Sequence, residues 1–278
     1  MTRLLKVVDS ETDKVKKLIF DLGDDEKVEF SIINKDGSYR ICAPSQTGCA
    51  MGCKICQLSD YKTKPRSLTL GEFRRCIDRV VSEIPRLSFL VSFMGSGEPL
   101  LYPGALVGNI MLCRQIYGQS VSFAFASMLP SHRALIEVAH TLLALGLKAK
   151  FHLSLHASSD ETRKQLIPNS TQPIRSLIES TNWCRYTTGS EVEIHYSPIA
   201  GVNDSDADIH KLGELLTHTP IHVKFLRFSE RPGCVLKRSE QFNPSILKDY
   251  GVTYEMYSAP GLDIGASCGQ FLPEAYSK

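Results

Sequence analysis

The chain has 278 residues, of which 42% are hydrophobic and 22% are charged, and its formal net charge is +2. This composition is that of a globular protein with a large core, and so mild a charge is no evidence for or against nucleic acid. The N-terminus lacks the pattern of a signal peptide, and the apolar runs are shorter than the roughly 20 residues that cross a bilayer. We therefore expect a cytoplasmic protein with no membrane partner.

The first 41 residues are predicted to form a short N-terminal extension. Residues 9–22 are predicted to form a helix that begins at Asp9 or Ser10 and is followed by the acidic turn DLGDDE. Residues 28–33 and 39–42 are predicted to form a β-hairpin across the turn at 34–37, because Asn, Asp and Gly favour tight turns. The rest of the chain, residues 42–278, is predicted to be the core domain.

From residue 68 onward, helical and extended patterns alternate. Thr69 is a suitable N-cap for the first helix. Strands separated by helices indicate βαβ units with a parallel sheet, and six units predict an α/β fold, a partial (β/α)6 barrel of the TIM type. The predicted helices are 68–83, 104–117, 131–145, 173–187, 205–217 and 243–249, and the predicted strands are 87–94, 120–127, 148–156, 190–198, 220–228 and 252–257.

The loop after the hairpin carries Cys49, Cys53 and Cys56 in the spacing C-x3-C-x2-C. A structural zinc site would need a fourth cysteine or histidine nearby. The next candidates, Cys76 and His132, lie on predicted helices without a pairing spacing. Three thiolates on one loop therefore favour an iron–sulfur cluster whose fourth iron position is open to a ligand.

Polar residues follow several predicted strands, at the barrel end where active sites lie. Gly95, Gly97 and Glu98 follow the strand at 87–94 in the segment FMGSGEPL, where glycines allow close approach and the carboxylate could bind an amino group. Ser154–Leu155–His156 and Ser229 each end a further strand. Each of these signals is weak alone, and their common position predicts a site.

Six cysteines lie outside the C-x3-C-x2-C loop. Cys268 stands between Ser267 and Gly269, and these small neighbours leave its sulfur accessible, so a reactive thiol and a small filler residue are equally good interpretations. Apart from Cys42 and Cys268, four cysteines remain. We interpret them as small core residues, because most of them fall on predicted helices. These four are Cys76, Cys113, Cys184 and Cys234.

From Val28 to Gln270 the sequence resembles the radical S-adenosylmethionine (SAM) RNA methyltransferases that modify adenine at carbon 2 or carbon 8, the RlmN/Cfr family. The family pattern C-x6-C-x3-C-x2-C corresponds to Cys42, Cys49, Cys53 and Cys56. Four further segments carry the resemblance: FMGSGEPL, LSLHASSDE, GVNDS and DIGASCGQ. The resemblance implies a radical SAM barrel that lacks the additional N-terminal domain of typical members.

The family's roles transfer to matching residues as expectations. Cys49, Cys53 and Cys56 would ligate a 4Fe–4S cluster. Cys268 would accept a methyl group from one SAM molecule, and a 5′-deoxyadenosyl radical from a second would abstract hydrogen from it. The resulting methylene radical would add to the adenine carbon. Cys42 would then release the product through a transient disulfide with Cys268, and Glu29 would accept a proton. The SAM site would comprise Gly97, Glu98, Ser154, Leu155, His156 and Ser229.

The chain departs from the family pattern at three positions near the expected cofactor. Ser96 stands where the family usually has methionine, and Ala124 stands where a cofactor-binding serine is expected, with Ser122 and Ser127 nearby. Ser229 replaces a common asparagine. These departures leave cofactor binding as the expectation and put its details in question.

The expected partners are ribosomal or transfer RNA and an electron donor such as flavodoxin or ferredoxin, and the expected state is a monomer. Two alternatives stay open: a radical SAM enzyme with a non-RNA substrate, and a non-catalytic iron–sulfur or zinc protein with a binding or regulatory role. Basic residues near the expected barrel mouth are candidates for phosphate contacts, with solvent-exposed loop charges as an equally good interpretation. They are Lys62, Lys64, Arg66, Arg227, Arg231, Lys237 and Arg238.

Overall fold

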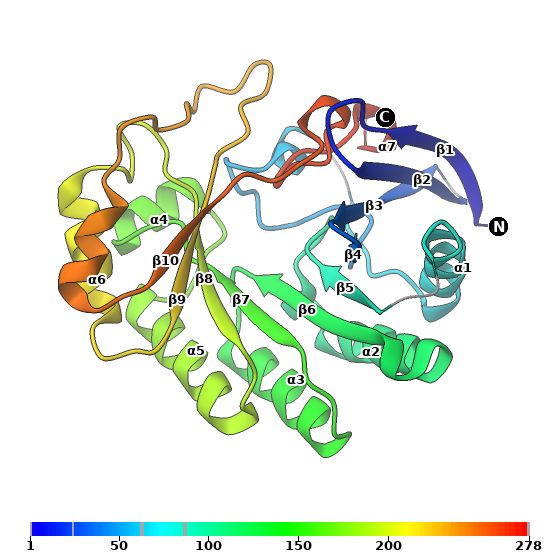
Figure 1. The fold of residues 1–278 in the computed structure, drawn as a ribbon, viewed down its shortest axis with the longest axis horizontal. Coiled ribbons are helices and arrows are strands. Elements are labelled where there is room, and N and C mark those ends of the chain that lie inside the picture. The colour runs from blue at the N-terminus through cyan, green and yellow to red at the C-terminus, as the bar shows by residue number, and fades with distance from the viewer. Residues whose placement is uncertain (1, 24, 62–63, 86–87, 277–278) are drawn as a thin grey trace.

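The computed structural model describes residues 2–23, 25–61, 64–85 and 88–276. Its ten-stranded sheet has a simple order, in which each strand neighbours the next strand along the chain (Figure 1). The pairs from β1 to β4 are antiparallel, and every pair from β4 to β10 is parallel. The strand β4 therefore joins an antiparallel N-terminal part to the parallel part.

The antiparallel part contains β1 (Arg3–Asp9), β2 (Val15–Gly23), β3 (Glu26–Lys35) and β4 (Ser38–Cys42). The predicted hairpin is confirmed as β3 and β4, and in its turn the Gly37 amide donates to the Asn34 side chain at 2.9 Å. The boundary expected between residues 41 and 42 falls inside β4. The division into an extension and a core remains a prediction.

The helix predicted over residues 9–22 is wrong, because most of this segment is the strand β2, which pairs in register with β3. Leu18, Phe20 and Leu22 on one face of β2 join the main core, whereas Ile19 packs in a separate cluster with Phe271 of the C-terminal segment. Both faces are thus covered by other parts of the protein. This removes the alternation that marks a half-exposed strand.

The parallel strands and their helices confirm the predicted α/β class, a partial barrel of the TIM type. The helices α1, α2, α3, α5 and α6 cover the outer face of the curved sheet (Figure 1). The strands after β4 are β5 (Phe89–Phe93), β6 (Val121–Ser127), β7 (Lys150–Ser154), β8 (Val192–Tyr196), β9 (His222–Leu226) and β10 (Tyr254–Tyr257). The helices are α1 (Leu70–Val81), α2 (Pro103–Tyr117), α3 (His132–Ala144), α4 (Asp160–Leu166), α5 (Ile174–Thr188), α6 (Asp206–Leu216) and α7 (Pro273–Tyr276).

Most predicted elements agree with the observed ones within a few residues. Thr69 is the N-cap of α1, as predicted, and forms a reciprocal capping box with Glu72. The predicted helix at 243–249 is a 3-10 helix, Pro244–Tyr250, and the helices α4 and α7 were not predicted. Leu87, at the start of the predicted strand 87–94, lies outside the described residues.

The chain after β10 returns to the N-terminal strands, where the red C-terminal segment lies beside β1–β3 (Figure 1). The short helix α7 packs against β3. Further 3-10 turns are Gln57–Asp60, Pro99–Leu101, Gly118–Ser120 and Leu262–Ile264. Within the described ranges, no helix combines the length and apolar character needed to cross a membrane.

Candidate active site

The loop after β4 brings three cysteines to one space. Cys49, Cys53 and Cys56 all border a cavity of about 170 Å³. Burial raises the pKa of the thiols, to about 12 for Cys49 and about 11 for Cys56. Three thiols that share one cavity fit the donor set of an iron–sulfur cluster, and its assembly must release their protons because thiolates are the ligands.

This cysteine loop is anchored by Arg231, whose side chain is only 6% exposed. Its guanidinium lies 2.7 Å from the Asp60 carboxylate and donates to the carbonyl oxygens of Lys54 and Cys56 at 3.2 and 3.3 Å. The sequence suggested Arg231 as a phosphate contact. The structure instead places it under the loop, where it fixes the backbone that carries Cys56.

The segment FMGSGEPL packs directly on the residues that precede the cysteine loop. A Cβ at Gly95 would lie 2.9 Å from the Ala43 carbonyl group, and one at Gly97 would lie 2.5 Å from Ser45 Oγ. Gly97 also has a φ of +105°, which disfavours any side chain. These glycines are required by contact between two segments of the protein, whereas the sequence suggested close approach to a ligand.

Glu98 is buried at the edge of the cysteine cavity and is held in place by three donors. Ser127 Oγ and the Leu100 amide donate to Oε1 at 2.5 and 3.0 Å, and the Met128 amide donates to Oε2 at 2.8 Å. Burial raises the pKa of Glu98, and these hydrogen bonds oppose that rise. A carboxylate offers about four lone-pair positions, so one acceptor position remains for an incoming ammonium group.

The segment Ser154–Leu155–His156 follows β7, and its residues separate into two environments. Ser154 and His156 border the cysteine cavity, whereas Leu155 is fully buried in the main core. His156 has a φ of 57°, an uncommon conformation outside glycine, and its Nδ1 accepts from the Ser197 amide at 3.1 Å. Burial lowers the pKa of His156 to about 3, so the ring is neutral and this bond leaves the proton on Nε2.

Arg163 of α4 is a buried residue of the site that the sequence did not reveal. Its guanidinium donates to the carbonyl oxygens of Ser154, Leu155 and Met128, with distances of 2.9 Å to Ser154 and 2.7 Å to Met128. It therefore ties the ends of β6 and β7 together beside the cysteine cavity. The capping residue Ser159 could have indicated α4, but no local pattern marks an arginine in a charged helix as buried.

A second cavity adjoins the first and is bordered by the three residues that are expected to be catalytic. Cys42, Cys268 and Glu29 all border it, and Cys268 borders both cavities. Burial raises the pKa of Cys42 to about 12, with nearby Cys268 contributing. The Cys268 thiol is exposed to this space, and desolvation by the surrounding walls raises its pKa as well.

Lys17 also borders this second cavity, and no pattern in the sequence marks it as a residue of the site. Its ammonium lies 2.6 Å from Glu29 Oε1 and donates to the carbonyl oxygen of Gly265 at 2.5 Å. The Leu272 amide donates to the other Glu29 oxygen at 3.1 Å. Desolvation raises the pKa of Glu29, and Lys17 opposes that rise. The pair links β2 and β3 to both sides of the Cys268 segment.

The segment around Cys268 also packs directly on the cysteine loop. Gly269 has a φ of +75°, and a Cβ there would lie 2.9 Å from the carbonyl oxygen of Ile55. The Gln57 amide donates to the Gly269 carbonyl at 2.8 Å, and the Gln57 side chain accepts from the Phe271 amide at 2.9 Å. These contacts place Cys268 next to the loop that carries Cys56.

The remaining expected cofactor positions are distributed differently. Gly97 borders the cysteine cavity, whereas Ser229 is half-buried and is not among the residues that border either cavity. Ser96, which departs from the family pattern, is fully buried and donates to the Gln46 carbonyl at 2.6 Å. Its side chain therefore points into the protein. Ala124 borders the second cavity, and Ser127 borders the first.

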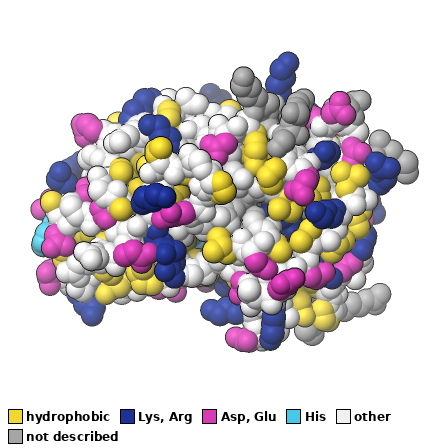
Figure 2. Space-filling model, turned by 90° about the horizontal axis from the view of Figure 1, so that it is seen from above, with side chains coloured by type: hydrophobic (Ala, Val, Ile, Leu, Met, Phe, Trp, Pro, Cys, Tyr) yellow, Lys and Arg dark blue, Asp and Glu magenta, His cyan; other side chains and the backbone are white. Residues whose placement is uncertain are grey.

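The proposed phosphate contacts are largely engaged in ion pairs. Arg66 bridges Glu26 and Glu72, and Lys237 lies 3.1 Å from Glu230. Arg238 and Arg227 both approach Glu240, at 2.6 and 3.9 Å. Lys62 lies outside the described residues. Figure 2 shows basic and acidic side chains interspersed on one face of the molecule, without a single positive patch.

Comparisons with known proteins agree with this geometry. Residues 44–212 match the model of the radical SAM superfamily. The chain is 31% identical over 275 residues to the dual-specificity RNA methyltransferase RlmN of Geotalea uraniireducens, covering 95% of this chain and 77% of that protein. It is 30% identical to the probable dual-specificity RNA methyltransferase RlmN of Clostridium perfringens, covering 99% and 80%.

Among solved structures, a radical SAM methyltransferase from Sphaerobacter thermophilus is similar in fold and sequence. The TM-score is 0.85 with 25% identity, and the match covers 97% of this chain and 80% of that one. The chain therefore belongs to the radical SAM superfamily and, within it, to the family of the dual-specificity RNA methyltransferases named RlmN.

Proposed function

We propose that this protein is an RNA methyltransferase that transfers a methyl-derived carbon to carbon 2 or carbon 8 of an adenine in ribosomal or transfer RNA. Radical SAM proteins use a 4Fe–4S cluster and SAM, and the three thiols and the Glu98 carboxylate that border the cysteine cavity are suitable ligands for these groups. The observation that carries the proposal is the position of Cys268 at the junction of the two cavities. A thiol there can face the cofactor on one side and Cys42 on the other.

The residues of the first cavity would bind the cofactors. Cys49, Cys53 and Cys56 would ligate the cluster, and the free acceptor position of Glu98 suits the SAM amino group. When bound, these groups supply a methyl group and one-electron radical chemistry, which an aromatic C–H carbon requires because it is no nucleophile. Ser154 and His156 would line the remaining wall of the cofactor site.

The residues of the second cavity would carry and release the methyl carbon. The Cys268 sulfur would form a bond to the methyl carbon as the bond from that carbon to the SAM sulfur breaks, and it would lose its thiol proton, which its raised pKa makes unfavourable without a proton acceptor. Glu29 would accept a proton from the substrate carbon. Cys42, having lost its own thiol proton, would then attack the Cys268 sulfur: an S–S bond would form, the bond from that sulfur to the transferred carbon would break, and this carbon would take up a proton to become the methyl group of the adenine.

Mass spectrometry of the Cys268 peptide tests this proposal. Protein expressed with its cluster should carry an added methyl group on Cys268, and a Cys42→Ala variant should accumulate protein covalently joined to RNA. A Cys76→Ala variant is the matched control, because Cys76 is buried in the main core. An unmethylated Cys268 in protein with an intact cluster would refute the carrier mechanism.

Sequencing the RNA that remains attached to the Cys42→Ala variant identifies the substrate. The proposal expects a single adenine as the site of attachment. Covalent capture of a small molecule or protein in place of RNA would favour the alternative of a radical SAM enzyme with another substrate. We further propose that the protein acts as a monomer and takes its electrons from a flavodoxin or ferredoxin.

A further inference from the structure

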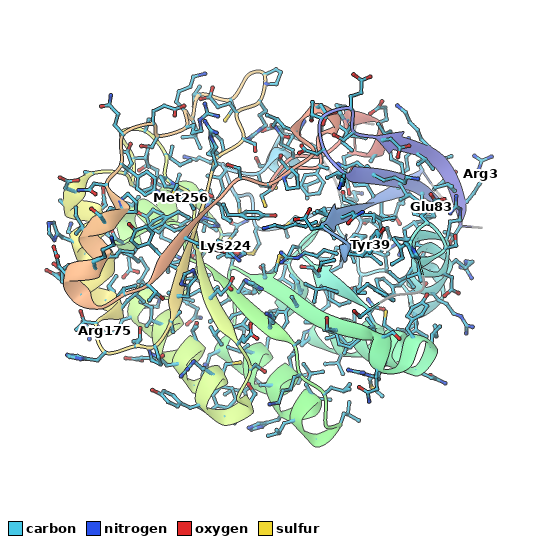
Figure 3. All side chains as sticks on the ribbon, viewed as in Figure 1. Arg3, Tyr39, Glu83, Arg175, Lys224 and Met256 are labelled. Atoms are coloured by element: carbon cyan, nitrogen blue, oxygen red, sulfur yellow. The ribbon has the colours of Figure 1, made fainter. Side chains whose placement is uncertain are left out.

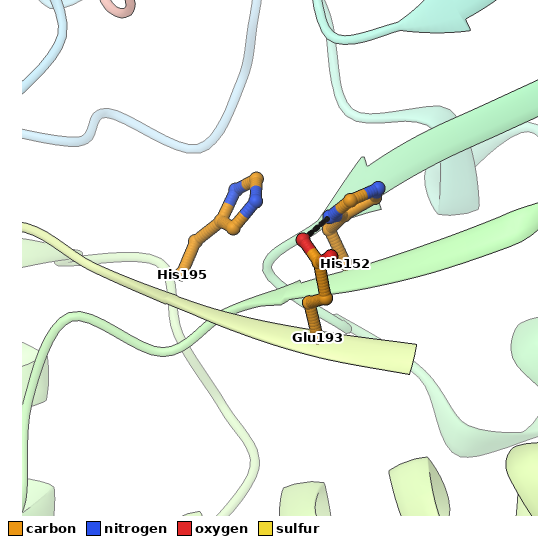
Figure 4. Close-up of side chains that lie close together, drawn as sticks. All are labelled: His152, Glu193 and His195. Carbon is orange, nitrogen blue, oxygen red and sulfur yellow. Dashed lines mark ion pairs between the residues drawn. The ribbon is translucent and has the colours of Figure 1, made fainter. Parts of the chain in front are cut away.

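Three side chains on the inner face of the barrel form a compact group outside the catalytic set. His152 extends from β7, and Glu193 and His195 extend from the neighbouring strand β8 (Figure 4). One nitrogen or carboxylate oxygen from each residue lies within 4.8 Å of the others. All three residues border the cavity that also contains Cys42 and Cys268.

Both histidines of this group are buried, and each has a ring nitrogen that makes no hydrogen bond with the described residues. His152 and His195 are each 7% exposed, and neither His152 Nδ1 nor His195 Nε2 has a hydrogen-bond partner among the described residues. His152 Nδ1 faces Glu193 Oε2 at 3.1 Å without the alignment of a hydrogen bond. Buried polar atoms are normally partnered, so such exceptions suggest an absent ligand or ion.

The protonation state of these rings suits metal binding. Burial lowers the pKa of His152 and lowers that of His195 further below its usual range. Burial thus disfavours the charged form of both rings, and a neutral imidazole is the form that offers a lone pair to a metal ion. For His195, burial and the neighbouring positive charge of Lys224 both lower the pKa.

Lys224 on β9 already neutralises Glu193, and it has another partner. Its ammonium lies 2.8 Å from Glu193 Oε2 and 2.9 Å from Glu255 Oε1. Figure 3 labels Lys224 near the centre of the barrel. A cation that binds Glu193 can therefore displace Lys224 toward Glu255 without leaving the ammonium unpaired. Charge repulsion by Lys224 does not exclude a metal ion here.

We propose that His152, Glu193 and His195 form a binding site for a divalent first-row metal ion, zinc in particular. Two imidazoles and one carboxylate are a known ligand set for zinc with an open fourth position. That position would face the cavity shared with Cys268 and could take water or a heteroatom of the substrate. The inference is independent of the methyl transfer, because it rests on residues outside the Cys42–Cys268 pair.

Metal analysis and X-ray absorption test the site. Protein with a reconstituted cluster is incubated anaerobically with Zn²⁺ and desalted, and zinc and iron are measured by mass spectrometry. We expect about one retained zinc ion per chain, with nitrogen or oxygen ligands at ~2.0–2.1 Å and no sulfur at ~2.3 Å in the zinc-edge spectrum. The wild-type spectrum tests the ligand set without any variant.

Variants then identify the ligands. His195→Ala, His152→Ala and Glu193→Gln should each lose most of the retained zinc while keeping the iron and the cluster absorbance. His210→Ala, at an exposed histidine on α6, is the matched control and should retain zinc. Zinc that is absent from the wild type, bound through sulfur or unaffected in His195→Ala would overturn the proposal. None of these results depends on whether the protein methylates RNA.

Discussion

At the scale of single residues, the buried pair of Lys17 and Glu29 links the N-terminal strands to the segment that carries Cys268. Lys17 is 1% exposed and Glu29 is 4% exposed, so neither charge is solvated by bulk water. A buried charge is tolerated when it has a partner and becomes costly when that partner is removed. Lys17 therefore acts on Cys268 through Glu29 and Gly265, as a positioning residue.

Replacing Lys17 by methionine should destabilise the protein by ~3–5 kcal/mol, because Glu29 is left buried without its counter-ion or must take up a proton. Denaturant unfolding measures the loss. The control is Lys6→Met, because Lys6 is an exposed lysine that pairs with Glu274 at the surface, and this change should have little effect. Equal effects of the two changes would contradict the assigned role of Lys17.

At the scale of elements, the start of α1 shows how local sequence determines local structure. The Thr69 amide donates to the Glu72 carboxylate at 2.8 Å, and the Glu72 amide donates to Thr69 Oγ1 at 3.2 Å. Arg66 adds two hydrogen bonds to the same carboxylate, at 2.8 and 2.9 Å. All three residues lie within seven positions, so the helix start could be predicted from the sequence.

This network should make stability depend on pH. Although burial acts to raise it, the hydrogen bonds from Arg66 and Thr69 lower the pKa of Glu72 from 4.5 to about 2. The folded state therefore favours the carboxylate. The resulting stabilisation is complete above the unfolded pKa, near 4.5, and is lost as the pH falls toward 2.

Glu72→Gln should accordingly reduce the free energy of unfolding at pH 6, and the difference from wild type should shrink progressively as the pH approaches 2. Glu137→Gln, an exposed position on α3, is the control and should give no such trend. Denaturant unfolding at several pH values measures the difference. A constant offset for Glu72→Gln at every pH would rule out ionisation as the source.

At the scale of the whole molecule, both ends of the chain converge on the cysteine loop. The N-terminal strands hold the Cys268 segment through Lys17 and through Asp13, whose carboxylate accepts from the Gly261 amide at 2.7 Å. Gly269 then rests on Ile55 of the loop. The relative position of the cysteine loop and the Cys268 segment is thus set by contacts between residues more than two hundred positions apart.

Gly269→Ala should reduce methylation of Cys268 without preventing SAM cleavage at the cysteine loop. The added Cβ collides with the Ile55 carbonyl, so Cys268 should shift while the cluster still assembles. SAM cleavage to 5′-deoxyadenosine should persist, and methylation of Cys268 should fall at least ~10-fold, the change expected for a barrier increase of about 1.4 kcal/mol. Gly233→Ala is the matched control. The φ of +77° at Gly233 imposes the same backbone strain, but nothing lies within 4 Å of the added Cβ.

Equal methylation in Gly269→Ala and Gly233→Ala would show that the contact with Ile55 does not position Cys268. Loss of the cluster in Gly269→Ala would show that the C-terminal segment supports the loop itself. Cluster absorbance and peptide mass spectrometry, measured on the same samples, separate these outcomes.

Features that depend on near neighbours could be predicted from the sequence. The alternation of helices and strands, the hairpin and the N-cap at Thr69 follow from residues within one or two turns, and the spacing of Cys49, Cys53 and Cys56 already indicated a cluster. Motifs spread along the chain carried the family resemblance. Local periodicity failed for β2, because the residues that pack on its second face, Leu58 and Phe271 among them, lie far from it in the sequence.

Properties that depend on distant partners became visible only in the folded protein. The tertiary structure placed Cys268 between the two cavities, put Arg163 and Arg231 in supporting roles, and assembled His152, Glu193 and His195 from neighbouring strands. Ser229 does not border either cavity, and the Ser96 side chain is buried against other residues of the protein. Burial and pairing set these properties, and both arise only when segments far apart in the sequence come into contact.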